Sequence, residues 1–179
     1  MAIGSTMYTF DVQLADTERG VYEDYSLRVA RHPSETEPYM LTRVLAYGLE
    51  YADGIAFGGT VSQADEPAVL VRDLTGLITA WIEVGAPDAE RLHHATRIAE
   101  RTVVYTHRDP VKVMTPLADK RIHRASDIRV YSFDGGFIDS AVSLLDRRNT
   151  LTMTVTEGML YLDLKGATLT TVVHEHELG

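Results

Sequence analysis

The chain has 179 residues, of which 45% are hydrophobic and 24% are charged, a composition typical of a globular protein with a packed core. It contains no cysteine, which excludes disulfide bonds, thiolate zinc sites and a cysteine nucleophile. Its formal net charge of −9 disfavours general nucleic-acid binding, because phosphate contacts need Lys and Arg, although a local basic patch stays compatible with it.

The apolar runs of the chain are all shorter than the ~18–20 residues that a membrane helix requires. The first residues, Met1 to Thr6, have neither the basic start nor the long apolar stretch of a secretion signal. We therefore expect a soluble, cytoplasmic protein without membrane association. Its length, and the absence of repeats and linkers, predict a single domain over residues 1–179. The sequence gives no indication of the oligomeric state.

The N-terminal part of the chain has the pattern of a β-hairpin. Residues 7–14 alternate between polar and apolar side chains, as expected for a strand with one apolar face. Turn-forming residues at 16–20 and a second β-rich run over 22–30 complete an antiparallel hairpin.

A helix is predicted next, because apolar residues from Leu41 to Ala52 recur at helical spacing. Its start has two interpretations. Ser34 and Glu37 have the spacing of a capping box. Pro38 is equally typical of a first helical turn, which would move the cap toward Thr36 or Glu37.

The centre of the chain alternates between strands and helices. After a glycine-rich segment at 53–64, the predicted elements are a short β run at 68–71, a strand at 77–84, a helix from Asp88 to about Arg101, a strand at 102–106, a helix from Pro110 to about Lys120, a strand at 128–133 and a helix at 138–148. Such alternation is typical of parallel strands joined by helices.

The C-terminal part is predicted to be all β. Three strands, at 151–156, 159–164 and 168–173, are joined by Glu157-Gly158 and Lys165-Gly166, which are hairpin-type turns. The predicted fold class is therefore α/β (α+β), with a mixed β-sheet flanked by helices, an additional N-terminal hairpin and C-terminal antiparallel strands.

One carboxylate stands out within the predicted strand at 77–84. Thr79, Trp81 and Glu83 share one face of this strand, and a carboxylate on an apolar strand is costly unless water, a cation or a donor meets it. Glu83 is therefore either solvated near the strand end, paired with an arginine, or a ligand of a divalent cation. In the last case Asp65 or Glu66 would supply a second oxygen ligand for Mg²⁺ or Mn²⁺.

Three segments resemble the YaeQ family of bacterial proteins: Ala30-Arg31-His32-Pro33-Ser34-Glu35-Thr36, Asp65-Glu66-Pro67, and Trp81-Ile82-Glu83-Val84-Gly85-Ala86-Pro87-Asp88. Length and element order fit nearly the whole chain. The resemblance implies a variation on the PD-(D/E)XK nuclease fold, with a restriction-endonuclease-like core. In that fold a hairpin carries acidic metal ligands, and a lysine two residues beyond the last acid assists hydrolysis.

Carried onto this chain, the resemblance makes Glu35 the helical acid, Asp65 or Glu66 the acid of the preceding strand, and Glu83 the acid of the third motif. The lysine position is then occupied by Gly85, which cannot activate water or stabilise charge on phosphate. Arg91 and His94, three residues apart on the next helix, share a face and are the candidates to replace the lysine.

Two functions from different classes follow. The first is Mg²⁺- or Mn²⁺-dependent hydrolysis of nucleic-acid phosphodiesters, with no organic cofactor. The second is a catalytically inactive nuclease-fold module that binds a protein or a nucleic acid, with the basic run Lys120 to Arg124 as a possible backbone contact or an ordinary solvated surface. A small-molecule enzyme with the same acidic pocket is a third, lesser hypothesis.

Overall fold

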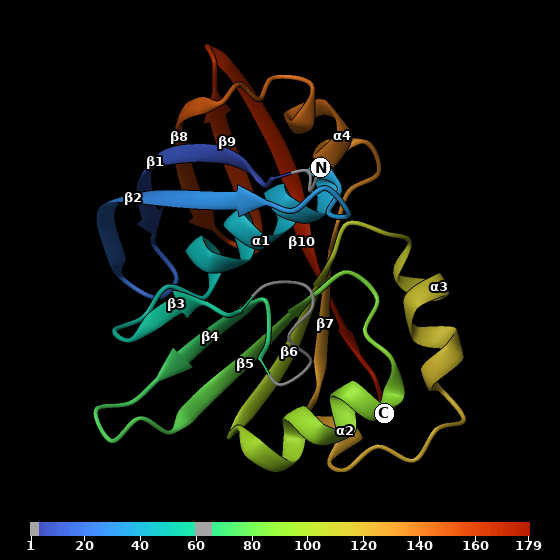
Figure 1. Cartoon of the computed structure of the whole chain (residues 1–179). Coiled ribbons are helices and arrows are strands. Elements are labelled where there is room, and N and C mark those ends of the chain that lie inside the picture. The colour runs from blue at the N-terminus through green and yellow to red at the C-terminus, as the bar shows by residue number, and fades with distance from the viewer. Residues whose placement is uncertain (1–3, 60–65) are drawn as a thin grey trace. The chain divides into compact units, whose positions relative to one another are not determined.

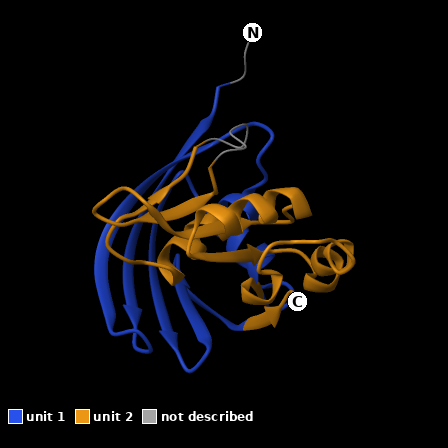
Figure 2. Cartoon of the chain, turned by 90° about the horizontal axis from the view of Figure 1, so that it is seen from below, with its two compact units in different colours: residues 1–41, 133–173 blue, residues 42–132, 174–179 orange. Residues whose placement is uncertain are grey.

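The computed structural model describes residues 4–59 and 66–179, which divide into two compact units (Figures 1 and 2). Unit 1 comprises residues 1–41 and 133–173, and unit 2 comprises residues 42–132 and 174–179. The chain passes between the units three times, inside α1, β7 and β10, so none of these boundaries has the composition of a linker. The single domain expected from the sequence stays a prediction. Within the described ranges, no helix is long and apolar enough to cross a membrane.

Unit 1 is built around strands in the hydrogen-bonded order β2-β1-β8-β9-β10. Their bounds are β1 (Thr6–Asp16), β2 (Val21–Arg31), β8 (Arg148–Thr156), β9 (Met159–Leu164) and β10 (Ala167–Glu177, of which 167–173 belong to this unit). The predicted N-terminal hairpin is confirmed, because β1 and β2 pair antiparallel over their whole length. The C-terminal antiparallel strands are also confirmed. The parallel pairing of β1 with β8, from opposite ends of the chain, was not predicted.

The two predicted hairpin turns of unit 1 have the backbone that their sequences require. Glu157 and Gly158 have φ angles of 51° and 76°, and Lys165 and Gly166 have 53° and 78°. Positive φ at both central residues is the geometry of a type I′ turn, which matches the twist of the flanking strands. Between these turns, alternate residues point into the core and are buried, as in Leu160, Leu162 and Leu164 of β9.

The helix predicted at 138–148 is wrong in its second half. Helix α4 (Phe137–Val142) stops six residues earlier, and Arg148 already begins β8. The reason is a pair of hydrogen bonds between the Asn149 side chain and the backbone of Asp146. The Asn149 amide oxygen accepts from the Asp146 N–H at 2.8 Å, and its amide nitrogen donates to the Asp146 carbonyl at 2.8 Å. These bonds close a turn where the helix would have continued.

Unit 2 has the strand order β7-β6-β5-β4-β3. The strands are β3 (Ile55–Phe57), β4 (Val69–Arg72), β5 (Ile78–Val84), β6 (Arg101–Thr106) and β7 (Arg129–Phe133, of which 129–132 belong to this unit). The predicted parallel pairing is confirmed for β5 with β6 and for β6 with β7. Strands β3, β4 and β5 pair antiparallel, so the sheet of this unit is mixed.

The helices of the central segment are shorter than predicted. They are α1 (Glu37–Leu49, residues 42–49 in unit 2), α2 (Ala89–Ile98) and α3 (Pro110–Met114), followed by short 3₁₀ helices at 115–117 and 125–127. The start of α1 follows the second interpretation, since the Tyr39 N–H donates to the Thr36 hydroxyl at 3.2 Å. Helix α2 ends before Arg101 because Ala99 is already extended and Arg101 begins β6.

Helix α2 packs on one face of β5, and this packing positions the candidate site. Trp81 is fully buried and packs against Ala95 of α2 and against Ala99, which directly follows the helix. Since side chains alternate along a strand, Glu83 points to the same face as Trp81. The structure therefore directs Glu83 toward α2, where the apolar stripe of the helix and its first turn meet the strand.

A second buried carboxylate lies at the end of α1 in unit 2. Glu50 accepts hydrogen bonds from Arg101 at 2.5 and 3.0 Å and from the Tyr105 hydroxyl at 2.7 Å. The bond to Glu50 raises the pKa of Arg101 above its ordinary value, and burial raises the pKa of Tyr105, so both side chains remain donors at neutral pH. This bidentate pair joins the end of α1 to β6.

We predict that Arg101→Met lowers the free energy of unfolding by about 1–2 kcal/mol, because it leaves the buried Glu50 carboxylate with a single donor. The value is reduced from that of a fully buried pair, since 46% of the Arg101 side chain is exposed. Urea denaturation measures the change. Arg108→Met, at an exposed arginine just after β6, is the matched control and is expected to change stability by less than about 0.5 kcal/mol. Equal losses in both variants would contradict the assignment.

Candidate functional site

The Glu83 carboxylate is held by two nitrogen donors. Its Oε1 accepts from the Arg91 Nε at 2.7 Å and from the Trp81 indole N–H at 2.6 Å. The Glu83 side chain is only 5% exposed and that of Arg91 27% exposed, so the ion pair is largely shielded from water. Of the alternatives that the sequence left open for Glu83, pairing with an arginine is the one that the structure contains.

Arg91 reaches Glu83 because the first turn of α2 is fixed next to the end of β5. Asp88 caps the helix by accepting from the Arg91 N–H at 2.8 Å, which places Arg91 in the first turn. The Arg91 guanidinium also lies 6.0 Å from the centre of the Trp81 ring. The helix cap, the aromatic ring and the carboxylate thus define one orientation for this arginine.

Gly85, at the position where the resemblance implies a lysine, has a backbone that disfavours one. Its φ angle is 92°, and its N–H donates to the Tyr105 carbonyl at 2.9 Å. A residue with a β-carbon is strained at such a φ angle by about 1–2 kcal/mol, whereas glycine adopts it freely. Glycine at this position therefore goes with a local chain path that suits it.

Glu66 is near this pair through its backbone rather than its carboxylate. The Glu66 carbonyl accepts from the Arg91 Nη2 at 2.7 Å. Its carboxylate accepts from the Gly59 N–H at 2.6 Å and lies 4.0 Å from the Arg72 guanidinium. Arg91 therefore bridges Glu83 and the segment that contains Glu66. Asp65, the other predicted acid of this segment, lies outside the described residues.

The remaining predicted residues are placed as follows. Glu35 is buried and belongs to unit 1, where its carbonyl accepts from Arg31 at 2.8 Å, so its meeting with Glu83 stays a prediction. His94 is exposed, and its ring lies edge-on to Trp81 at 5.8 Å between ring centres. Arg91 and His94 thus lie against the same aromatic ring, as their three-residue spacing predicts.

The described residues do not fit a divalent cation at Glu83 as they stand. Oε1 already has two donors, and the adjacent guanidinium carries the positive charge that a metal ion would bring. Across residues 4–59 and 66–179, no three His, Asp or Glu side chains gather as a metal site. The chemistry that this arrangement supports is neutralisation of a buried carboxylate by an internal cation.

A basic surface beside α2 is more extensive than the sequence indicated. The His123 N–H donates to the His93 Nδ1 at 3.0 Å, and the Arg124 Nη2 donates to the Glu100 carbonyl at 2.7 Å, so the end of this basic run contacts α2 and the residue between α2 and β6. We refer to five exposed residues together as the basic face: Arg97, Lys120, Arg121, His123 and Arg124. Arg97 joins it because a residue four positions after His93 lies on the same side of the helix. The sequence showed the basic run but not its proximity to α2.

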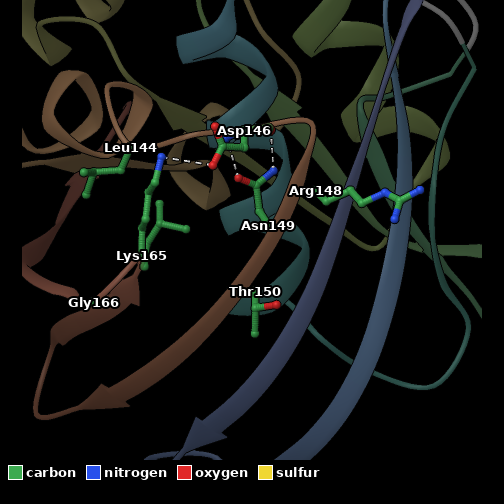
Figure 3. Close-up of a pocket in the computed structure, with 8 residues that line it drawn as sticks. Leu144, Asp146, Arg148, Asn149, Thr150, Lys165 and Gly166 are labelled. Atoms are coloured by element: carbon green, nitrogen blue, oxygen red, sulfur yellow. Dashed lines mark hydrogen bonds and ion pairs between the residues drawn. The ribbon is translucent and has the colours of Figure 1, made fainter.

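Unit 1 contains a separate open cavity of about 330 Å³ that no sequence pattern indicated (Figure 3). Its polar wall includes Asp146, Asn149 and Lys165, and the Lys165 Nζ lies 3.0 Å from the Asp146 carboxylate. The Asn149 amide is used by the turn described above. Arg148, although part of the wall, extends away from this group in Figure 3. These polar side chains bind one another, so their main contribution is to the turn before β8.

Comparison with known proteins agrees on one family. A family model described as YaeQ protein matches residues 1–173. Curated relatives include the "Uncharacterized protein YaeQ" of Escherichia coli (strain K12), 31% identical over 164 residues, and that of Salmonella typhi, 30% identical over 164 residues; in each case the match covers 90% of both chains.

Solved structures agree as well. The YaeQ protein from Xanthomonas axonopodis pv. citri matches with a TM-score of 0.86 at 26% identity, over 98% of this chain and 99% of the other. The YaeQ protein from Pseudomonas syringae matches with a TM-score of 0.84 at 30% identity, over 98% of both chains.

We predict that Arg91→Met lowers the free energy of unfolding by about 2–3 kcal/mol, because it leaves the buried Glu83 without its counter-charge. The double variant Glu83→Met/Arg91→Met should lose less than the sum of the single variants, with a coupling energy of about 1–3 kcal/mol in urea denaturation. Arg97→Met, on the exposed side of the same helix, is the control and should be near neutral. Additive losses would show that the pair has no energetic coupling.

Proposed function

The chain belongs to the YaeQ family, and on that premise we propose that it is a nuclease-fold protein that binds nucleic acid without hydrolysing it. In this proposal the restriction-endonuclease-like core consists of α1, the hairpin of β4 and β5, and α2. Supporting it, the predicted last acid is on β5, and the segment containing Glu66 directly precedes β4. The cytoplasmic location expected from the sequence belongs to the same proposal.

The Glu83–Arg91 ion pair is the observation that supports binding without hydrolysis. A carboxylate that binds a catalytic metal must present its oxygens to that ion, whereas Glu83 Oε1 is directed to an arginine and an indole. Gly85 adds a second argument, since it supplies no charge to activate water or stabilise phosphate. A protein can keep an enzyme fold without its activity when the residues of the site change.

The basic face supports nucleic acid as the ligand. Lys120, Arg121 and Arg124 follow one another within five residues, and α2 adds Arg97 from the neighbouring element. Residues 91–99 and 120–124 contain no Asp or Glu. The nearby Asp127 lies 3.5 Å from the Arg124 guanidinium and offsets part of its charge, so Arg97, Lys120 and Arg121 contribute most to the face. Clustered, exposed Lys and Arg attract the phosphate backbone locally even though the whole chain carries a net charge of −9.

Metal-dependent hydrolysis is the second candidate, favoured by one specific observation. Both hydrogen bonds to Glu83 in the described structure end on Oε1, so Oε2 is not engaged by Arg91 or Trp81. The sequence-based hypothesis, with Mg²⁺ or Mn²⁺ held by Glu83 and by Asp65 or Glu66 and with Glu35, Arg91 and His94 assisting, therefore remains a proposal to be tested beside the first.

The test measures binding and cleavage on the same samples. We expect labelled single-stranded DNA, duplex DNA or RNA to bind in fluorescence anisotropy with an affinity that falls with salt, and to remain intact on gels after incubation with Mg²⁺ or Mn²⁺. Lys120→Gln/Arg121→Gln should weaken binding about tenfold and reduce the slope of log K against log salt by about 1.4–1.8. Arg108→Gln/Lys112→Gln removes the same charge elsewhere and should leave binding within about twofold.

Three results would overturn the proposal. If the wild-type protein binds none of these nucleic acids at low salt, the basic face is an ordinary solvated surface. If metal-dependent cleavage occurs and is lost in Glu83→Ala, the second candidate is correct. Cleavage that persists in Glu83→Ala would remove this site from the reaction.

A further inference from the structure

Strand β2 of unit 1 has a long hydrogen-bonding edge. Its eleven residues all pair with β1, and β2 stands at the end of the strand order, so within the described part of the chain its other side has no strand partner (Figure 1). Exposed edges of this length are sites where another β-strand can add, and proteins usually shorten, cover or charge them. The β2 edge carries exposed charges of both signs, Asp24 and Arg28.

The direction of the free backbone groups on β2 follows from the pairing on the other side of β1. The Thr9 N–H donates to the Arg147 carbonyl, next to β8, so the odd-numbered residues of β1 bond toward β8 and the even-numbered residues toward β2. Because the even-numbered Phe10 of β1 lies opposite Leu27 of β2, the odd-numbered residues of β2 are the ones that exchange backbone hydrogen bonds with β1. The residues whose N–H and C=O groups point to the free edge are Tyr22, Asp24, Ser26, Arg28 and Ala30.

These five residues also share one exposed side of the sheet. Ser26 is at their centre and its hydroxyl donates to Asp11 of β1 at 2.5 Å. Asp24 lies two positions before Ser26 and Arg28 two positions after it, so the two opposite charges are symmetric about Ser26. Tyr22, 63% exposed, and the small residue Ala30 are symmetric in the same way.

From this symmetry we propose that β2 pairs antiparallel with β2 of a second copy of the chain, about a two-fold axis at Ser26. In this register Asp24 faces the partner's Arg28 and Arg28 faces the partner's Asp24. Tyr22 covers the partner's Ala30 at each end. All five pairs exchange backbone hydrogen bonds, about ten in total, and the two sheets become continuous.

The charges favour this register over the other symmetric registers of the same edge. A two-fold axis at Asp24 would bring two aspartates face to face, and an axis at Arg28 would do the same with two arginines. Like charges directly opposite each other on paired strands are destabilising, and opposite charges are stabilising. Axes at Tyr25 or Leu27 would place neither charge opposite its counterpart, so only the axis at Ser26 brings each aspartate opposite an arginine. This contact does not depend on the nucleic-acid proposal.

Sedimentation equilibrium between about 1 and 100 µM tests the proposal, because a contact of this size is expected to associate in the micromolar range. The wild-type protein should show a monomer–dimer equilibrium. Asp24→Arg and Arg28→Asp each bring two pairs of like charges together, so each should associate at least about tenfold more weakly. Asp163→Arg, an equal charge change at an exposed residue of β9, is the control and should associate like the wild type.

Charge exchange separates a lost contact from a damaged fold. The double variant Asp24→Arg/Arg28→Asp should dimerise again, and an equimolar mixture of the two single variants should form a heterodimer, because both restore opposite charges in the same register. A wild-type protein that stays monomeric at about 100 µM would overturn the proposal. So would single variants that dimerise like the wild type, or a double variant and a mixture that both remain monomeric.

Discussion

The candidate site depends on one constraint, which is that the buried carboxylate of Glu83 needs a counter-charge. Strand β5 is buried on both faces near this residue, so solvent cannot supply the compensation. Arg91 supplies it from the first turn of α2, and Asp88 fixes that turn. The packing of α2 on Trp81 and the left-handed backbone at Gly85 lead the chain from Glu83 to Arg91. A change in any of these residues alters the environment of the carboxylate.

Local patterns predicted much of the fold, and long-range contacts could not be predicted in the same way. Alternation identified β1 and β2, and Glu157-Gly158 identified a turn that needs positive φ angles. The predicted end of α4 was wrong because hydrogen bonds from the Asn149 side chain to the Asp146 backbone compete with the backbone bonds of a longer helix. The pairing of β1 with β8 joins residues that are about 140 positions apart, and no local spacing specifies such a contact.

For the site, the sequence identified the residues but not their partners. Periodicity placed Trp81 and Glu83 on one face and suggested that Arg91 and His94 share another, and both features are present. Which of the open alternatives applies to Glu83 depends on where α2 crosses β5, which is a tertiary property. The basic run at 120–124 was visible, whereas its proximity to α2 depends on two side-chain to backbone bonds. Net charge described neither this face nor the β2 edge, because both are local arrangements.

A crystal soaked in Mn²⁺ and measured for anomalous scattering tests the central claim most directly, because it observes the metal and the ion pair together. The account predicts that Arg91 Nε remains within hydrogen-bonding distance of Glu83 Oε1, with no manganese peak beside that carboxylate. A manganese ion bound to Glu83, with Arg91 displaced, would contradict the account and establish a metal centre in its place.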